Sequence, residues 1–422
     1  MQLVAYGAQD IYLTGNPQIT FFKVVYRRHT NFAVESIEQT FNGEADFGKR
    51  VTATISRNGD LIQQMYLEVV LPIIGTANQM WTYGVGNALI KQAEIEIGGQ
   101  LIDRQYGDWM NIWTELTVPA GKRAGYDNMV GNRLTTGAIA IQTGGLDAEV
   151  IQRLYVPLQF WFNRNPGLAL PLIALQYHEV KLNLELRAVT ELLNVTAATI
   201  TAALSCKLYV DYVYLDTDER RRFAQVSHEY LIEQVQFTGA ESIGANEGAK
   251  NVTLNFNHPV KELIWVHTDV LSTTIREDTG NRWFNYSGFT AAADVDSFTT
   301  ALLQLNGHDR FSLRYADYFR KVQNYEHHTR CPRVGKELDV DVDDNRNQYI
   351  YSYSFALSPE EHQPSGTCNF SRIDNAVLQL KYGADSGAGF AAQTHGMNLN
   401  VYAVNYNVLR IMSGMGGLAY SN

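Results

Sequence analysis

The chain has few cysteines and no long apolar run, and these two shortages exclude several classes of protein. Its 422 residues contain three cysteines, Cys206, Cys331 and Cys368, none of them in a Cys-x-x-Cys pair. An odd and sparse set argues against a disulfide framework and indicates a reducing compartment. The first residues lack the basic and apolar regions of a signal peptide, and no stretch reaches the roughly 18 apolar residues of a membrane span. We therefore expect a soluble chain made in the cytosol.

Charged residues are also scarce. They make up 18% of the chain, against about 25% in average domains, and the formal net charge is −10. Arginine outnumbers lysine, and there are 24 Tyr and 18 Phe. This bias is typical of protein that buries surface against other protein, although a tyrosine-rich β core would also produce it. The negative charge argues against a surface that neutralises phosphates, so we expect no direct sequence-specific binding of nucleic acid.

Motifs for catalysis and for metal binding are missing as well. None of the ten histidines stands two positions from another, so neither half offers the His-x-His pair of a metal-binding double cupin. The acidic run 339–344 lacks the glycine and the glutamate that a calcium loop requires at its sixth and twelfth positions. A surface loop explains His327, His328 and Cys331 better than a metal site does. We predict no catalytic, cofactor-binding or metal-binding residue, and no enzymatic activity.

What the chain does contain is a duplication. The stretch 37–43 returns as 232–239, and six further landmarks recur in the same order about 190 to 210 positions later. A conserved order at such a spacing fits one β unit duplicated in tandem better than a short solenoid repeat. The further pairs are 55–58 with 254–257, 65–69 with 263–267, 95–100 with 303–308, 157–161 with 352–356, 180–184 with 376–380, and 209–213 with 399–403.

Each copy has short predicted strands separated by Gly, Pro and Asn turns, and one helix is predicted over 108–116. Such a pattern predicts antiparallel sandwiches, and about eight strands per copy favour the jelly roll. The predicted fold is all-β: two tandem eight-stranded antiparallel jelly-roll sandwiches, a double jelly roll, with long loops and few short helices. Its parts are an N-terminal arm (1–30), a first jelly roll (31–216), a tight inter-domain connection (217–228), a second jelly roll (229–412) and a C-terminal tail (413–422).

Two arginine clusters are candidate contact sites. Arg27 and Arg28 precede the first copy of the repeated strand, and Arg220, Arg221 and Arg222 precede the second. Phosphate binding is one interpretation of these clusters. The net acidity of the chain favours the other, in which they form salt bridges at an interface or at the base of the domains.

Long and weakly patterned segments separate several strands and are predicted as surface loops. Asn194 and Asn285 lie in two of them, within Asn-x-Ser/Thr sequons, and are candidate glycosylation sites. The segments are 117–150, 186–204, 268–300 and 324–347.

The N-terminal arm has no counterpart in the second copy. Its stretch 19–26 has apolar residues on both faces, as expected of a segment that packs against something larger. Two alternatives remain at this point: the arm packs on its own domain, or it contacts a neighbouring subunit.

Long blocks of sequence carry a specific resemblance. The chain closely resembles the major capsid proteins of nucleocytoplasmic large DNA viruses, in particular those of the phycodnavirus branch that infects algae. The likeness extends from end to end, through 7–23 (GAQDIYLTGNPQITFFK), 55–62, 166–180 (PGLALPLIALQYHEV), 363–375 (QPSGTCNFSRIDN) and 406–420.

The resemblance implies two jelly rolls side by side and three chains in a capsomer of pseudo-hexagonal outline. Such capsomers tile an icosahedral shell around an inner membrane and a DNA core, together with minor capsid and penton proteins. The expected location is the outer shell of the virion, with synthesis and assembly in the host cytoplasm. The alternatives are a carbohydrate-binding β-sandwich attachment protein and, less well supported, an enzyme on the same fold.

Overall fold

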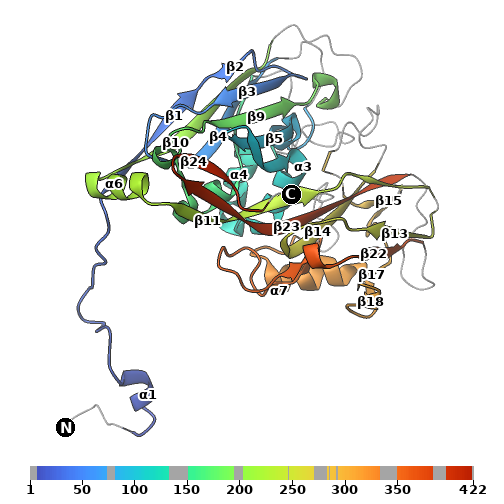
Figure 1. Cartoon of the computed structure of the whole chain (residues 1–422). Coiled ribbons are helices and arrows are strands. Elements are labelled where there is room, and N and C mark those ends of the chain that lie inside the picture. Colours follow the sequence, from blue (N-terminus) through green and yellow to red (C-terminus); the bar gives the residue numbers. More distant parts are fainter. Residues whose placement is uncertain are drawn as a thin grey trace.

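The computed structural model describes residues 7–73, 81–132, 151–193, 203–245, 247–269, 283–284, 286–290, 293–332, 349–383 and 396–420. Within these residues the chain forms two β sandwiches connected by helix α6 (Thr217–Gln225), and an N-terminal segment extends away from both (Figure 1).

The first sandwich consists of two antiparallel sheets. One has the order β1 (Phe32–Gln39), β10 (Ser205–Leu215), β4 (Leu61–Leu71) and β7 (Gln152–Pro157), with β8 (Leu170–Pro171) paired to β4. The other has the order β2 (Phe41–Asn42), β3 (Arg50–Thr54), β9 (Val180–Leu186), β5 (Ile90–Ile97) and β6 (Gln100–Tyr106). Every second residue of β9 is buried, because one face of the strand lies on the core between the sheets.

The second sandwich repeats this arrangement. One sheet has the order β11 (His228–Phe237), β23 (Met397–Met412), β14 (Pro259–Asp269) and β20 (Tyr351–Ser354). The other has the order β13 (Ala249–Thr253), β22 (Ala376–Lys381), β17 (Thr300–Leu305) and β18 (His308–Asp309). Short additional strands are β12 (Glu241–Ile243), β15 (Gly288–Thr290), β16 (Ala293–Val295), β19 (Arg314–Tyr315), β21 (Cys368–Asn369) and β24 (Met415–Leu418).

Both sandwiches use the same strand order. Without β2, β8 and the short additional strands of roll 2, each described unit has eight principal strands. The first, eighth, third and sixth of these form one sheet, and the second, seventh, fourth and fifth form the other. This is the order of a jelly roll. The predicted double jelly roll is therefore confirmed, and the two sandwiches are called roll 1 and roll 2 below.

The strand ladders also show which residues correspond between the rolls. Tyr66 of β4 and Ile264 of β14 correspond in the predicted pairing of 65–69 with 263–267. Tyr66 lies opposite Pro157, and Ile264 lies opposite Ser352. The predicted pairing of 157–161 with 352–356 is thus confirmed. The ladder between the third and eighth strands shifts register at the same place in both rolls, which supports a common origin.

The predicted pairing of 209–213 with 399–403 is wrong by three residues. Tyr209 lies opposite Tyr66, and the residue opposite Ile264 is Tyr402. Side chains alternate between the two faces of a strand, so an odd shift exchanges inward and outward residues.

The stretch that begins at Ile37 is also matched to the wrong residues of β11. Ile37 lies opposite Val210, and the corresponding residue of roll 2, opposite Ala403, is Gln236 rather than Ile232. The shift of four residues preserves the alternation of inward and outward side chains, which is why the sequence alone does not reveal it.

The turn between the fourth and fifth strands is the same in both rolls. Gly98 and Gly99 have φ of 58° and 85°, and Asn306 and Gly307 have φ of 53° and 76°. Two successive residues with positive φ form the two-residue turn whose twist matches that of the flanking strands, and glycine and asparagine tolerate this conformation.

Helices are short and lie mostly between strands. Helix α3 (Gly107–Thr117) confirms the helix predicted over 108–116, whereas α4 (Ala120–Val130) occupies the start of a segment that was predicted as a loop. The described residues contain no helix whose length and apolar character would let it span a bilayer. The other helices are α1 (Ile11–Thr14), α2 (Val85–Leu89), α5 (Trp161–Arg164), α7 (Gln323–His327), the π-helix η5 (Tyr318–Val322), and the 3-10 helices η1 (Pro166–Leu168), η2 (Leu172–Ala174), η3 (Val189–Glu191) and η8 (Phe370–Arg372).

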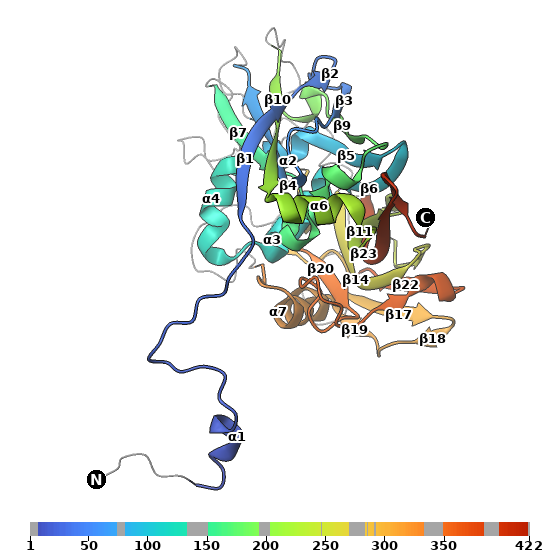
Figure 2. The same cartoon turned by 60° about the vertical axis from the view of Figure 1, so that its left-hand side comes forward.

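The N-terminal arm lies away from both rolls (Figures 1 and 2). Its apolar side chains are exposed to solvent, Phe21 to 91% and Phe22 to 98%. Of the two alternatives for the arm, packing on its own domain is therefore not what the structure shows.

Candidate assembly surfaces

Roll 1 and roll 2 meet along the edge strands β6 and β11. The backbone N–H of Val235 donates to Oδ1 of Asp103 at 3.2 Å, and Gln234 Nε2 donates to the carbonyl of Ile102. Asp103 is buried in this contact. Burial raises the pKa of Asp103 to about 6, although the hydrogen bond from Val235 and the charge of Arg164 oppose the rise.

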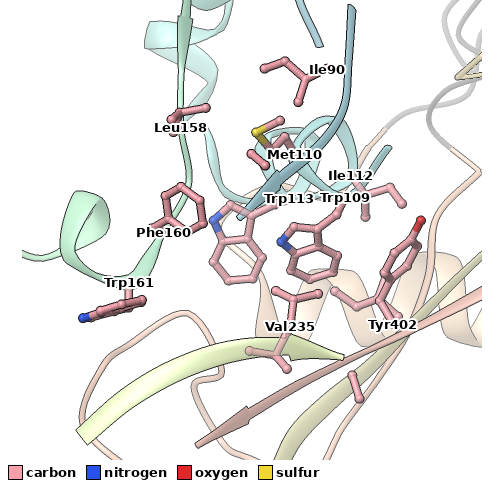
Figure 3. Close-up of a cluster of buried hydrophobic side chains, with 14 of the residues drawn as sticks. Ile90, Trp109, Met110, Ile112, Trp113, Leu158, Phe160, Trp161, Val235 and Tyr402 are labelled. Atoms are coloured by element: carbon pink, nitrogen blue, oxygen red, sulfur yellow. The ribbon is translucent and has the colours of Figure 1, made fainter. Parts of the chain in front are cut away.

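Aromatic side chains of α3 cover the outer surface of roll 2. The rings of Trp109 and Tyr402 are 5.4 Å apart, and Tyr106 at the end of β6 contacts Phe237 edge-on at 5.2 Å. In Figure 3 the two tryptophans of α3, Trp109 and Trp113, lie above Val235, and Tyr402 lies beside Trp109. Large buried rings contribute most of the free energy of such a contact, so α3 fixes the rolls together.

A buried group of charges crosses the same junction. Arg164 of roll 1 lies 3.2 Å from Glu233 of β11, and Lys261 of β14 lies 2.7 Å from the other oxygen of that carboxylate. Burial opposes ionisation of Glu233, but His362, Arg164 and Lys261 outweigh it and lower the pKa of Glu233 to about 2. The Arg164 guanidinium also lies over the Trp113 ring at 4.6 Å. Its charge thus pairs with Glu233 while its flat surface packs on the tryptophan.

A second ionic contact connects helices α3 and α4 of roll 1 to the segment that follows α7 in roll 2. Glu115 of α3 is fully buried and pairs with Arg123 of α4 and, at 3.1 Å, with Arg330 of roll 2. Burial raises the pKa of Glu115, although both arginines oppose the rise.

Beside it, His328 lies between two carboxylates, 3.2 Å from Glu262 and 3.0 Å from Glu360. Burial lowers the pKa of His328, but the two glutamates outweigh it and raise the pKa to about 9. The imidazolium is therefore a fixed positive charge at neutral pH. His327, His328 and Cys331 do not converge on one point, and the described residues contain no group of three metal-ligating side chains.

The surface of roll 1 that corresponds to the covered surface of roll 2 is open. Tyr209 stacks on Tyr66 with ring centres 5.3 Å apart, and Tyr155 meets Tyr66 edge-on at 6.3 Å. All three tyrosines are half-buried and point away from the core, and we call this surface the tyrosine face. A hollow of about 440 Å³ lies on it, lined by Tyr66, Tyr155 and Met129 of α4 among others.

Roll 2 carries an exposed apolar group after its fifth strand. Leu313, Tyr315 and Val322 are exposed, and with Tyr318 they surround a hollow of about 590 Å³. We call these four residues the η5 patch. It follows the fifth strand of roll 2, as the buried helix α3 follows the fifth strand of roll 1.

The predicted arginine sites are dispersed. Arg27 and Arg28 are exposed on the arm, and Arg221 and Arg222 are exposed on α6, without a partner among the described residues. Arg220 pairs with Asp60 of roll 1 at 3.1 Å. Two further predictions, glycosylation at Asn194 and at Asn285, lie outside the described residues, as does the acidic run 339–344.

Sequence reasoning missed the buried charges of the junction. A signal for one of them was available, because Lys261 and Glu262 interrupt the apolar run from Pro259 to Val266 in strand β14. A charged pair inside an apolar run indicates buried ionic partners rather than a solvated face. Arg164 gives no such signal, since its neighbours are the polar residues of a turn.

Two family models together match nearly the whole chain. "Major capsid protein N-terminus" matches residues 20–216, and "Large eukaryotic DNA virus major capsid protein" matches residues 219–417. The major capsid protein of Pyramimonas orientalis virus is 54% identical over 100% of this chain and 99% of its own length. The chain belongs to the major capsid proteins of large eukaryotic DNA viruses. The predicted family is thereby confirmed, and membership favours this function over a carbohydrate-binding attachment protein.

Further relatives agree with this assignment. The major capsid protein of Paramecium bursaria Chlorella virus 1 is 45% identical over 100% of this chain and 99% of its own. The crystal structure of PBCV-1 VP54 superposes with a TM-score of 0.77 at 41% identity, covering 96% of this chain and 100% of that one. The Faustovirus major capsid protein has a TM-score of 0.70 at 12% identity, over 96% of this chain and 94% of that one, which shows the shared capsid-protein fold alone. This capsid protein is accordingly a structural component of a virion.

Proposed function

We propose that three copies of this major capsid protein associate into a capsomer of pseudo-hexagonal outline, and that these capsomers tile the icosahedral shell of a large double-stranded DNA virus. One observation carries the proposal: each chain contains two rolls with the same strand order, so three chains supply six similar units around one axis. A three-fold particle of this kind can pack in a hexagonal array.

We propose the remaining roles from what membership of the family implies. Minor capsid and penton proteins contact the shell, which lies over an inner membrane, and assembly takes place in the host cytoplasm. The protein has no catalytic role and binds no nucleic acid by sequence. The exposed N-terminal arm, with Arg27 and Arg28, and the outer side of α6, with Arg221 and Arg222, contact neighbouring proteins at the base of the capsomer.

The native mass of the purified protein tests the central step. Light scattering at moderate and at high salt should give three times 47.5 kDa in both, because buried apolar area, unlike exposed ion pairs, is not screened by salt. Negative-stain images should show particles with three-fold symmetry. A single-chain mass at both salt concentrations, with no larger particle at high protein concentration, would contradict the proposal.

A further inference from the structure

We propose that the C-terminal segment 413–420 is a detachable strap, which extends from roll 2, binds in a preformed site on roll 1, and leaves that site while both rolls stay folded. We call this segment the strap and the site that receives it the strap site. The strap site consists of Gln100 at the start of β6 and of the segment 175–178 before β9. The inference concerns a single chain and does not depend on the proposed capsomer.

The backbone of the strap is bound along both of its edges. Strand β24 pairs with the end of β23, and the N–H of Ala419 donates to a carbonyl of β23 at 2.8 Å. Successive N–H groups of a strand point to opposite edges, so those of Gly416 and Leu418 face away from β23. The Gly416 N–H donates to Nδ1 of His178 at 3.2 Å. The Leu418 N–H donates to Oε1 of Gln100 at 3.3 Å, so roll 1 occupies the outer edge of the strand.

The strap site holds its shape through contacts within roll 1. Arg57 donates from Nη2 to the carbonyl of Leu175 at 2.5 Å and to that of His178 at 3.2 Å, and thereby fixes both ends of the segment 175–178. The His178 ring lies so close to Gly98 that no Cβ atom would fit there. Because all of these partners belong to roll 1, we expect the strap site to keep its shape when the strap leaves.

Glycines of the strap lie where its backbone comes closest to roll 1. Gly416 is buried, and a Cβ atom on it would meet Leu175 Cδ2 at 2.7 Å and Ile97 Cγ2 at 3.2 Å. A Cβ atom on Gly414 would meet the Tyr177 ring at 2.6 Å. The Gly414 carbonyl also accepts from the Tyr177 N–H at 3.0 Å. The ligand of the strap site is therefore an extended peptide with glycine at these two positions.

The strap is held less firmly than the junction at α3. Met415, Ala419 and Tyr420 are exposed, and the bonds of the strap to roll 1 come from its backbone. The junction instead buries rings such as Trp109 completely. Weakly packed segments open locally at a lower free energy than the whole chain. The strap should therefore leave its site while β6, β11 and α3 stay in place. Figure 2 shows the C-terminal end beside β6.

Hydrogen exchange of the full chain, resolved to single amides by mass spectrometry, tests the strap. Valine favours strands, so Gly416→Val should keep β24 paired with β23 and prevent docking on roll 1. The amides of Tyr177 and Leu418, which bond across the contact, should then exchange more than about tenfold faster, and that of Ala419 should change little. The matched control, Met415→Val, alters an exposed residue of the same strand and should change none of these rates.

A second variant disturbs the contact from roll 1. Gln100 is exposed, and Gln100→Ala removes the acceptor of the Leu418 N–H, so this amide should exchange faster while β6 keeps its protection. Unchanged exchange at Leu418 in both Gln100→Ala and Gly416→Val would overturn the strap. Loss of protection in β9 or β22 together with that of Leu418 would overturn it as well, because the rolls would then open with the strap.

A free peptide tests the strap site itself. Gly414 has a φ of 80°, so Gly414→Val should break the turn before β24 and displace the strap of the full chain. A synthetic peptide of residues 413–422, added at about 1 mM to replace the effective concentration of a tethered segment, should then restore slow exchange of the Tyr177 amide. The same peptide with Gly416→Val should not.

A natural-sequence peptide that leaves the Tyr177 amide unprotected would overturn the strap site. None of these exchange rates depends on the native mass of the protein. A single-chain mass therefore counts against the proposed capsomer, whereas unchanged exchange counts against the strap.

Discussion

The sheet β1-β10-β4-β7 and the sheet β11-β23-β14-β20 have one strand order and two different outer surfaces. Their inward residues are alike in character: Met65 and Leu67 correspond to Leu263 and Trp265, and all four are buried. Outward residues differ, since roll 1 has Tyr66 and Glu68 where roll 2 has the buried pair Ile264 and Val266.

The difference follows from what covers each surface. Roll 2 is always covered, because its partner roll belongs to the same chain, and a permanent contact can bury aliphatic side chains together with charges that have fixed partners. In the capsomer proposed above, the outer surface of roll 1 stays exposed until another molecule covers it. Half-polar tyrosines suit a surface that must be soluble first and buried later.

The largest expected effect comes from removing the aromatic cover of roll 2. We expect Trp109→Ala to lower the free energy of unfolding by about 4 kcal/mol, since a fully buried ring leaves a cavity between the rolls. Tyr325→Ala, at an exposed position of α7, should change it by less than about 0.5 kcal/mol. Urea titration of both variants measures the contrast, and equal losses would mean that α3 has no special role.

The next effect is smaller and concerns the buried charges. Lys261→Met removes the shortest ionic contact of Glu233 and leaves its buried carboxylate with Arg164 and His362, so we expect a loss of about 3 kcal/mol. The corresponding residue of roll 1 is Gln63, which is half-buried, and Gln63→Met should be nearly neutral. Thermal melting of the two variants decides whether the charge group stabilises roll 2 alone.

Sequence reasoning accounts for the fold better than for the junction. Alternating apolar residues and Gly/Asn turns specify strands and hairpins locally, so the eight-strand unit and the turns at Gly98 and Asn306 could be predicted. Register between distant strands depends on three-dimensional pairing, and the pairing of Ile37 failed for that reason. The ion pair of Arg164 with Glu233 joins residues far apart in the chain, and composition gives no sign of it.

Asp103 should give a pH-dependent difference between the junction and the corresponding site of roll 2. Its pKa in the folded chain, about 6, is above the ordinary value of 3.8. Protonated Asp103 stabilises the folded chain. This stabilisation is complete below pH 3.8 and is lost as the pH rises through 6. The variant Asp103→Asn has no carboxyl to ionise and does not lose this stabilisation. Its free energy of unfolding, relative to that of the unchanged protein, should therefore rise by on the order of 2 kcal/mol between pH 4 and pH 7.

The control for this prediction is Arg310, the residue of roll 2 that corresponds to Asp103. The backbone N–H of Arg310 donates to Leu303, and Asp103 lies opposite Ile95 in the same way. Arg310→Gln lies on an exposed strand end and should show no pH-dependent change in that range. Melting temperatures of both variants across the range give the comparison. A constant offset for Asp103→Asn would show that its carboxyl does not titrate there.

The smallest expected effect separates a salt bridge within the chain from a contact between chains. Arg220 is 61% exposed and its partner Asp60 is 8% exposed, so Arg220→Ala should cost at most about 1 kcal/mol, and less at high salt. Arg221→Ala removes an arginine without a described partner and should leave the stability of the single chain unchanged. If Arg221→Ala instead weakens capsomer or shell formation while melting normally, α6 contacts a neighbouring protein at its outer side. If neither variant changes the melting temperature or the assembly, the arginines of α6 contribute only solubility. An exposed ion pair that salt screens would then add nothing measurable to the contact between the rolls, which α3 already stabilises.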